Sequence, residues 1–212
     1  MVKLSLLIFL ISADSLPKSE LRDSGNEIEK YTEWKLERQE EGIKVYTRWL
    51  TYNDELNVRQ MKGELDLEKS TSEVASLILD EKLATQWMNR VKEYNRLKSF
   101  APNEFIIYTL FNLPWPLNNQ DLIAKYEVER KHGNILVSIK GIADYIPEKK
   151  GINRMPHFEG EWKLTALQNG KTRIEYTVHT KSKSKGPRWV TDPIIQNNFW
   201  STLNNLQKML EE

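Results

Sequence analysis

Three histidines are the side chains of this chain best suited to acid–base chemistry or metal binding. His132, His157 and His179 are scattered, with His132 in a predicted turn and His179 on the outward positions of a predicted strand. A zinc site needs converging ligands, and a catalytic triad needs a nucleophile beside its base. The chain has no cysteine, and it lacks a phosphate-binding glycine loop, a nucleophile elbow and an HExxH helix. We therefore predict no catalytic residue, metal ion or cofactor.

Aromatic side chains offer a different chemistry, which is contact with a bulky apolar ligand. The chain has 7 Trp, 8 Tyr and 6 Phe. Such rings fill cores or line pockets. Tyr108, Tyr126, Trp162 and Phe199 are expected between a sheet and a helix. Their pattern leaves open whether they fill this space or line it, although protein interiors are normally close-packed.

The charge balance argues against a nucleic-acid partner. The 31 Lys and Arg residues are matched by 30 Asp and Glu residues. Proteins that bind nucleic acids usually carry a clear basic excess. The length of 212 residues suits one domain with a short extension.

Strands with alternating hydrophobicity would position these aromatic residues. In the segment 43–50, Ile43, Val45, Thr47 and Trp49 alternate with polar residues, which is typical of a half-buried strand. Turn residues such as His132-Gly133-Asn134 and Asn169-Gly170 separate later segments. Sequential hairpins of this kind indicate an antiparallel sheet. The predicted strands are 43–50, 58–65 (after a turn at Asn53-Asp54), 104–111, 121–130, 135–143, 158–167, and a last one with Ile174, Tyr176 and Val178 facing inward.

Helices are expected at two places. Ser70 and Glu73 are spaced as a capping box, which predicts a helix over 71–83 followed by a short one near 84–89. Asp192 before Pro193 predicts the start of a long C-terminal helix. Its apolar stripe must cover the inner face of the sheet, so we predict an α+β fold. The stripe consists of Ile195, Phe199, Leu203, Leu206 and Leu210.

The N-terminus has the layout of a secretory signal peptide. Lys3 precedes the apolar run 4–12, and small residues follow at Ala13 and Ser15. The alternative is a buried N-terminal strand or helix. We predict a signal peptide over 1–15, a linker over 16–30 and one domain over 31–212. The protein is then exported to the periplasm or the exterior; without a genuine signal it is cytoplasmic.

Five segments in order resemble the START (steroidogenic-acute-regulatory-related lipid transfer) family, over about Trp34 to Leu210. One is similar to the family's Pro-aromatic-Pro and Asn-Arg-Asp signature, and another to its Gly-x-x-Arg strand. The segments are GIKVYTR (42–48), QWMNRVKE (86–93), LPWPLNNQDLI (113–123), KGINRM (150–155) and GPRWV (186–190) with the helix that follows.

The resemblance implies a helix-grip fold, in which a curved antiparallel sheet wraps around the C-terminal helix and encloses a hydrophobic tunnel. Family members mostly carry or sense a lipid, sterol or similar molecule without transforming it. The expected partner is thus a hydrophobic small molecule, with transient membrane contact and no nucleic acid. Related helix-grip proteins include polyketide cyclases and aromatases, so an enzyme of that kind is the alternative. A third hypothesis is an interaction module whose pocket is filled by side chains.

Some family positions can be carried over residue by residue. Glu93 matches a position where several members place an acidic residue in the cavity, and Arg154 matches the arginine of Gly-x-x-Arg. A buried carboxylate needs a partner, and Arg154 is the expected one for Glu93. Tyr126 lies on the strand where sterol-binding members carry an arginine, and Gln120 replaces the arginine of the signature. The ligand-contacting residues expected in all are Trp87, Glu93, Tyr108, Trp115, Tyr126, Arg154, Trp162, Tyr176, Phe199 and Leu203.

Overall fold

The computed structural model describes residues 28–52, 56–115, 117–181 and 187–212. The predicted signal peptide, most of the predicted linker, the turn at Asn53-Asp54, and residues 116 and 182–186 lie outside the described residues.

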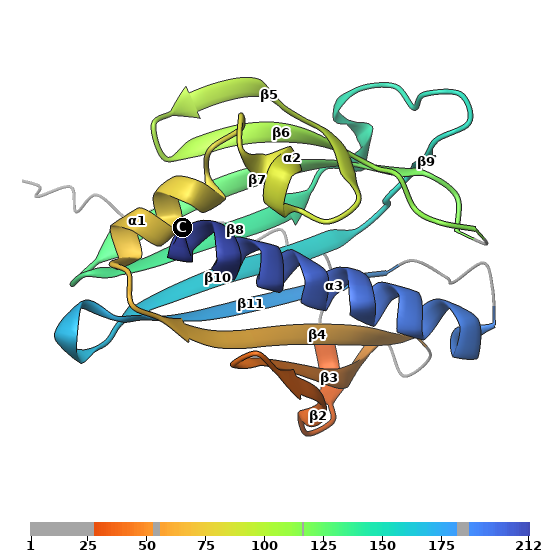
Figure 1. The fold of residues 1–212 in the computed structure, drawn as a ribbon. Coiled ribbons are helices and arrows are strands. Elements are labelled where there is room, and N and C mark those ends of the chain that lie inside the picture. Colours follow the sequence, from red (N-terminus) through yellow and green to blue (C-terminus); the bar gives the residue numbers. More distant parts are fainter. Residues whose placement is uncertain (1–27, 53–55, 116, 182–186) are drawn as a thin grey trace, which may run out of the picture.

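A curved, mainly antiparallel sheet wraps around one long helix, α3 (Arg188–Glu211), which crosses its concave face (Figure 1). The parallel pairing is that of β9 with β7. Neighbouring strands are hydrogen-bonded in the order β1-β3-β4-β11-β10-β8-β7-β6-β5, with β2 paired to β3. The strands are β1 (Ile28–Tyr31), β2 (Lys35–Glu40), β3 (Ile43–Tyr52), β4 (Leu56–Leu67), β5 (Val91–Ala101), β6 (Glu104–Phe111), β7 (Gln120–Lys131), β8 (Asn134–Gly141), β9 (Asn153–Arg154), β10 (Phe158–Ala166) and β11 (Thr172–Thr180).

This arrangement confirms the predicted helix-grip fold, and most predicted strands are present. The alternation in β10 and β11 gives each strand an inner and an outer face, because successive side chains point to opposite sides. Trp162 pairs with Tyr176 in the antiparallel register of these two strands. The turn residues His132 and Asn169 adopt positive φ, each beside a glycine that does the same. The last residues of the predicted linker form part of β1.

The helices differ from the prediction at their ends. The capping box of Ser70 and Glu73 is formed at the start of α1 (Thr71–Ile78), which ends before the predicted residue 83. A short helix, α2 (Ala84–Trp87), follows. The helix α3 begins at Arg188, one turn before the predicted cap at Asp192. Asp192 therefore lies inside the helix, where its carboxylate pairs with Arg59 of β4.

The core lies between α3 and the inner face of the sheet. The predicted stripe of α3 is buried at Phe199, Leu203, Leu206 and Leu210, while Ile195 is half-buried. These residues belong to one cluster with the inner side chains of the sheet and with α1 and α2. Among the described residues, no helix is both long and apolar enough to span a membrane.

Candidate functional site

A chain of aromatic rings joins the sheet to α3. The ring centroids of Trp162 and Tyr176 are 3.7 Å apart and stacked, and Tyr176 stacks on Phe199 of α3 at 5.4 Å. Trp87 of α2 meets Trp162 edge-on at 6.0 Å. Four of the residues expected to contact a ligand therefore lie together, and they come from the sheet, from α2 and from α3.

The helix rests directly on the sheet at Gly63. A methyl group on this residue would overlap Cδ1 of Leu203 and lie 3.1 Å from Cε1 of Phe199. Leu203 is fully buried. Glycine thus permits close approach of α3 to β4. The resemblance implies a tunnel between the two layers, but at Gly63 the helix and the sheet are in direct contact.

Three phenols supply polar atoms within this apolar interior. Tyr94 and Tyr126 are buried, and each hydroxyl shifts the pKa of the other. Burial raises the pKa of both, and it also raises the pKa of Tyr176. The three side chains are therefore neutral at physiological pH. The indole Nε1 of Trp87 is buried and has no hydrogen-bond partner in the part of the chain that the structure describes.

Tyr108 and Trp115, which are predicted to contact the ligand, lie outside the aromatic interior. Tyr108 is buried on the outer face of β6, in a separate cluster with Ile106 and Ile123. The strand β6 is buried on both faces, because the segment around Ile142 covers its outer side. Trp115 is 88% exposed, in the loop after β6.

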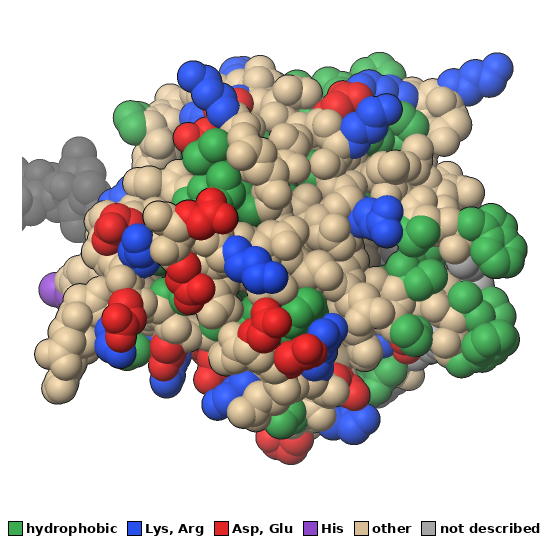
Figure 2. All heavy atoms as spheres, in the orientation of Figure 1, with side chains coloured by type: hydrophobic (Ala, Val, Ile, Leu, Met, Phe, Trp, Pro, Cys, Tyr) green, Lys and Arg blue, Asp and Glu red, His purple; other side chains and the backbone are tan. Residues whose placement is uncertain are grey.

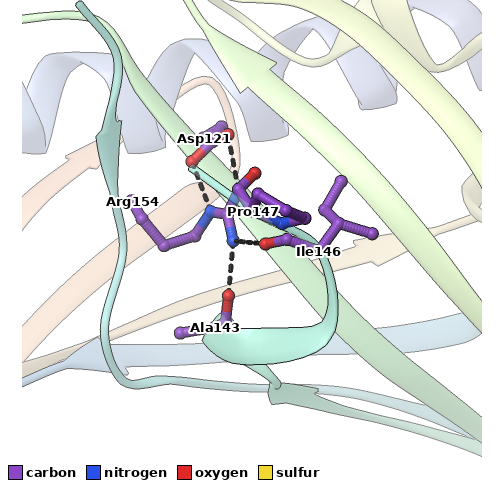
Figure 3. A network of polar contacts seen from close by, with 5 residues as sticks. All are labelled: Asp121, Ala143, Ile146, Pro147 and Arg154. Atoms are coloured by element: carbon purple, nitrogen blue, oxygen red, sulfur yellow. Dashed lines mark hydrogen bonds and ion pairs between the residues drawn. The ribbon is translucent and has the colours of Figure 1, made fainter. Parts of the chain in front are cut away.

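Arg154 is buried, but its partner is Asp121 and not Glu93. Its Nε lies 2.6 Å from Oδ1 of Asp121, and the exposed fractions of the two side chains are 2% and 1% (Figure 3). Glu93 instead lies half-buried on the edge strand β5, with Oε2 3.9 Å from Nζ of Lys149. The predicted Glu93–Arg154 pair is wrong, because Arg154 enters the fold on the outer side of β7.

The pair ties the segment between β8 and β9 to the sheet. The Arg154 guanidinium also donates to the carbonyl oxygens of Ala143, Ile146 and Pro147 (Figure 3). The hydrogen bond to Asp121 raises the pKa of Arg154. The two family-like signatures therefore meet as one structural unit, away from the aromatic interior.

A polar groove of about 860 Å³ lies on the outer face of the sheet. His179 is buried at its side, with Nε2 2.8 Å from the Tyr52 hydroxyl and 3.6 Å from Glu159. Burial lowers the pKa of His179. No cluster of metal-binding side chains occurs within the described ranges of the chain. The groove is lined by Trp34, Arg48, Gln60, Lys62, Lys125, Glu127, Ser138, Ile139, Lys140, Glu159, Gly160, Glu161, Lys163, Glu175, Thr177 and His179.

Two bacterial proteins are similar to the chain at the level of sequence. An uncharacterized protein of Pseudomonas aeruginosa is 28% identical over 181 residues, which cover 85% of this chain and 88% of that protein. The crystal structure of a STAR-related lipid transfer protein from Xanthomonas axonopodis is 28% identical with a TM-score of 0.74, over 84% of this chain and 99% of that one.

More distant structures share the fold alone. Human StAR-related lipid transfer protein 5 is 19% identical with a TM-score of 0.71, over 84% of this chain and 86% of that one. An aromatase/cyclase from Streptomyces is 12% identical with a TM-score of 0.56, over 73% of this chain and 94% of that one. The family model of the START domain matches residues 27–212, which is most of the chain. With its helix-grip fold and the two signature segments joined at Asp121 and Arg154, the chain belongs to the START domain family.

Proposed function

We propose that the protein binds one apolar ligand between α3 and the inner face of the sheet and releases it chemically unchanged. The observation that carries this proposal is the contact between the two layers. An amphipathic helix of 24 residues covers an aromatic sheet face, and it is held there mainly by apolar contacts. A lipid chain can replace such contacts with others of the same kind, because hydrophobic contacts are non-directional.

Binding requires α3 to separate from β4. Three hydrogen bonds join the helix to the segment of α2 and Asn89, and its other polar contacts are few among the described residues. The carboxylate of Asp192 lies 2.7 Å from the guanidinium of Arg59, near the start of the helix. The guanidinium of Arg38 on β2 stacks on the ring of Trp200 and donates to Asn197. Both contacts are partly exposed, so water can replace them when the helix moves.

Transient membrane contact is part of the proposal. Trp189 in the first turn of α3 is 80% exposed, and Trp115 is 88% exposed. The loop that follows β6 and the start of α3 extend toward the same end of the molecule, where Figure 2 shows hydrophobic side chains gathered on the surface. Tryptophan prefers the interface between lipid and water. This end of the molecule is the proposed site of ligand exchange.

Export is a further element of the proposal. It rests on Lys3 and the apolar run 4–12. N-terminal sequencing of the protein from its native host would test it, and an intact Met1 would contradict it.

The experiment that tests binding starts with the protein purified from its native host. Native mass spectrometry would identify a copurifying lipid, and delipidated protein would then be titrated with fluorescent fatty acids, phospholipids and sterols. Saturable one-to-one binding with intact ligand recovered supports the proposal. Absence of binding across the panel contradicts it, and a chemically altered ligand would favour a cyclase-like enzyme.

A further inference from the structure

Within the part of the chain that the structure describes, the inner face of the sheet carries no buried charge. Among the described residues, the buried charged side chains are Asp121 and Arg154, which neutralise each other on the outer side of β7. Partly exposed ion pairs border the interior at Arg59–Asp192 and at Arg96–Glu81. An ionised head group inside would therefore meet no opposite charge that is not already paired, and burial of an unpaired charge is strongly unfavourable.

The same interior holds hydrogen-bonding groups that are neutral and incompletely used. The hydroxyls of Tyr94 and Tyr126 can each donate one proton and accept hydrogen bonds, and they lie close enough to shift each other's pKa. The Nε1 of Trp87 can only donate, and it has no partner among the residues that the structure describes, although the side chain is 0% exposed. A buried donor without a partner is costly, so a ligand that accepts from it gains affinity.

We infer that the ligand brings an uncharged hydroxyl or carbonyl group to Trp87, Tyr94 and Tyr126, and that the protein selects neutral lipids over fatty acids and phosphate-bearing lipids. This inference rests on the proposed binding of a ligand beneath α3. The indole N–H donates to the ligand oxygen, and the phenol pair donates to it or accepts from it. The raised pKa values of Tyr94 and Tyr126 keep both phenols protonated, so the interior does not acquire a charge of its own.

Three probes of equal chain length separate the polar contact from the apolar one. Delipidated protein is titrated at about pH 8, where palmitate is ionised, with hexadecanol, palmitate and hexadecane. We expect hexadecanol to bind about fivefold or more tightly than hexadecane, as one net hydrogen bond provides. Palmitate should bind roughly tenfold or more weakly than hexadecanol, because its carboxylate would be desolvated without a counter-charge.

Variants assign the effect to the named groups. Tyr126→Phe and Trp87→Phe should each abolish most of the preference for hexadecanol over hexadecane. Tyr108→Phe is the matched control, since this buried tyrosine lies on the outer face of β6, and it should leave the preference unchanged. Thermal melts identify any variant that fails to fold, and Tyr94→Phe replaces such a variant in the comparison.

The outcomes distinguish this inference from the proposed function. If hexadecane and palmitate bind as tightly as hexadecanol, or if Tyr126→Phe and Trp87→Phe keep the full preference, a ligand is bound but the neutral hydrogen-bonding site is refuted. If none of the three probes binds, the proposed function itself fails, and the inference fails with it.

Discussion

The close contact at Gly63 makes α3 sensitive to a single methyl group. In Gly63→Ala the new Cβ would overlap Cδ1 of Leu203. Leu203 cannot rotate into solvent because it is fully buried, and Phe199 lies on the other side of the new methyl. The helix must therefore shift outward or the side chains must leave their preferred rotamers. Overpacking of this kind costs about 1–3 kcal/mol.

A double-mutant cycle separates this overlap from other effects of the substitution. Leu203→Ala alone should cost about 2–5 kcal/mol, because it leaves a cavity under α3. In the double variant the methyl group added by Gly63→Ala occupies part of that cavity, so the total loss should fall short of the sum by roughly 0.5–3 kcal/mol. Urea unfolding followed by tryptophan fluorescence measures all four free energies of unfolding. Strictly additive losses would refute the reasoning, since they would mean that residues 63 and 203 do not touch.

Other parts of the fold lead to three more predictions. Arg154→Met should lower the free energy of unfolding by about 3–5 kcal/mol, because Asp121 keeps a buried charge without a partner. Combining Arg154→Met with Asp121→Leu should recover much of this loss. A double variant no more stable than Arg154→Met alone would contradict this prediction. Trp162→Ala should lower the free energy of unfolding by about 3–5 kcal/mol, since the ring is buried between Tyr176 and Trp87. A variant that melts at the wild-type temperature would show that Trp162 does not lie on the inner face of the sheet. The pKa of His179 is lowered in the folded state, so below its ordinary value of 6.5 the unfolded chain binds the proton more readily, and stability should fall as the pH drops below about 6.5. In urea titrations at several pH values, His179→Gln should reduce this dependence of stability on pH. An equally steep dependence in the variant would mean that another group titrates.

Local patterns predicted the elements that are buried on one face. The strands β10 and β11 alternate strictly, so Trp162 and Tyr176 were placed on the inner face correctly. The strand β5 was missed because both of its faces carry polar residues and its pairing with β6 has three irregularities. The strand β2 was missed for a similar reason, since it is almost wholly exposed and has no apolar alternation. Period-two patterns report burial, and these strands bury little.

Tyr108 shows a second reason why a sequence pattern can fail to predict the face on which a side chain lies. The segment Glu104–Phe111 is apolar at nearly every position, so alternation cannot tell its inner face from its outer face. The face is decided by the register with β7, in which Tyr108 pairs with Ile123 and Ile107 with Ala124. The segment 142–152 packs over the outer side and makes burial of Tyr108 there favourable. That contact joins residues far apart in the sequence.

Local patterns in the sequence could not predict that Arg154 pairs with Asp121, because the pair depends on the topology of the sheet. Since Arg154 is paired there, it supplies no positive charge to the interior. Asp121 stands in the signature segment that resembles the family's Asn-Arg-Asp, and Arg154 stands in the one that resembles Gly-x-x-Arg. They meet because β9 pairs in parallel with β7, with Asp121 opposite Arg154 in register. With this arginine engaged by Asp121 and by three carbonyl oxygens, it is not available to bind an anionic head group inside. Discrimination among ligands then depends on neutral groups such as Trp87 and Tyr126, whose hydrogen bonds depend on shape and proximity and not on net charge.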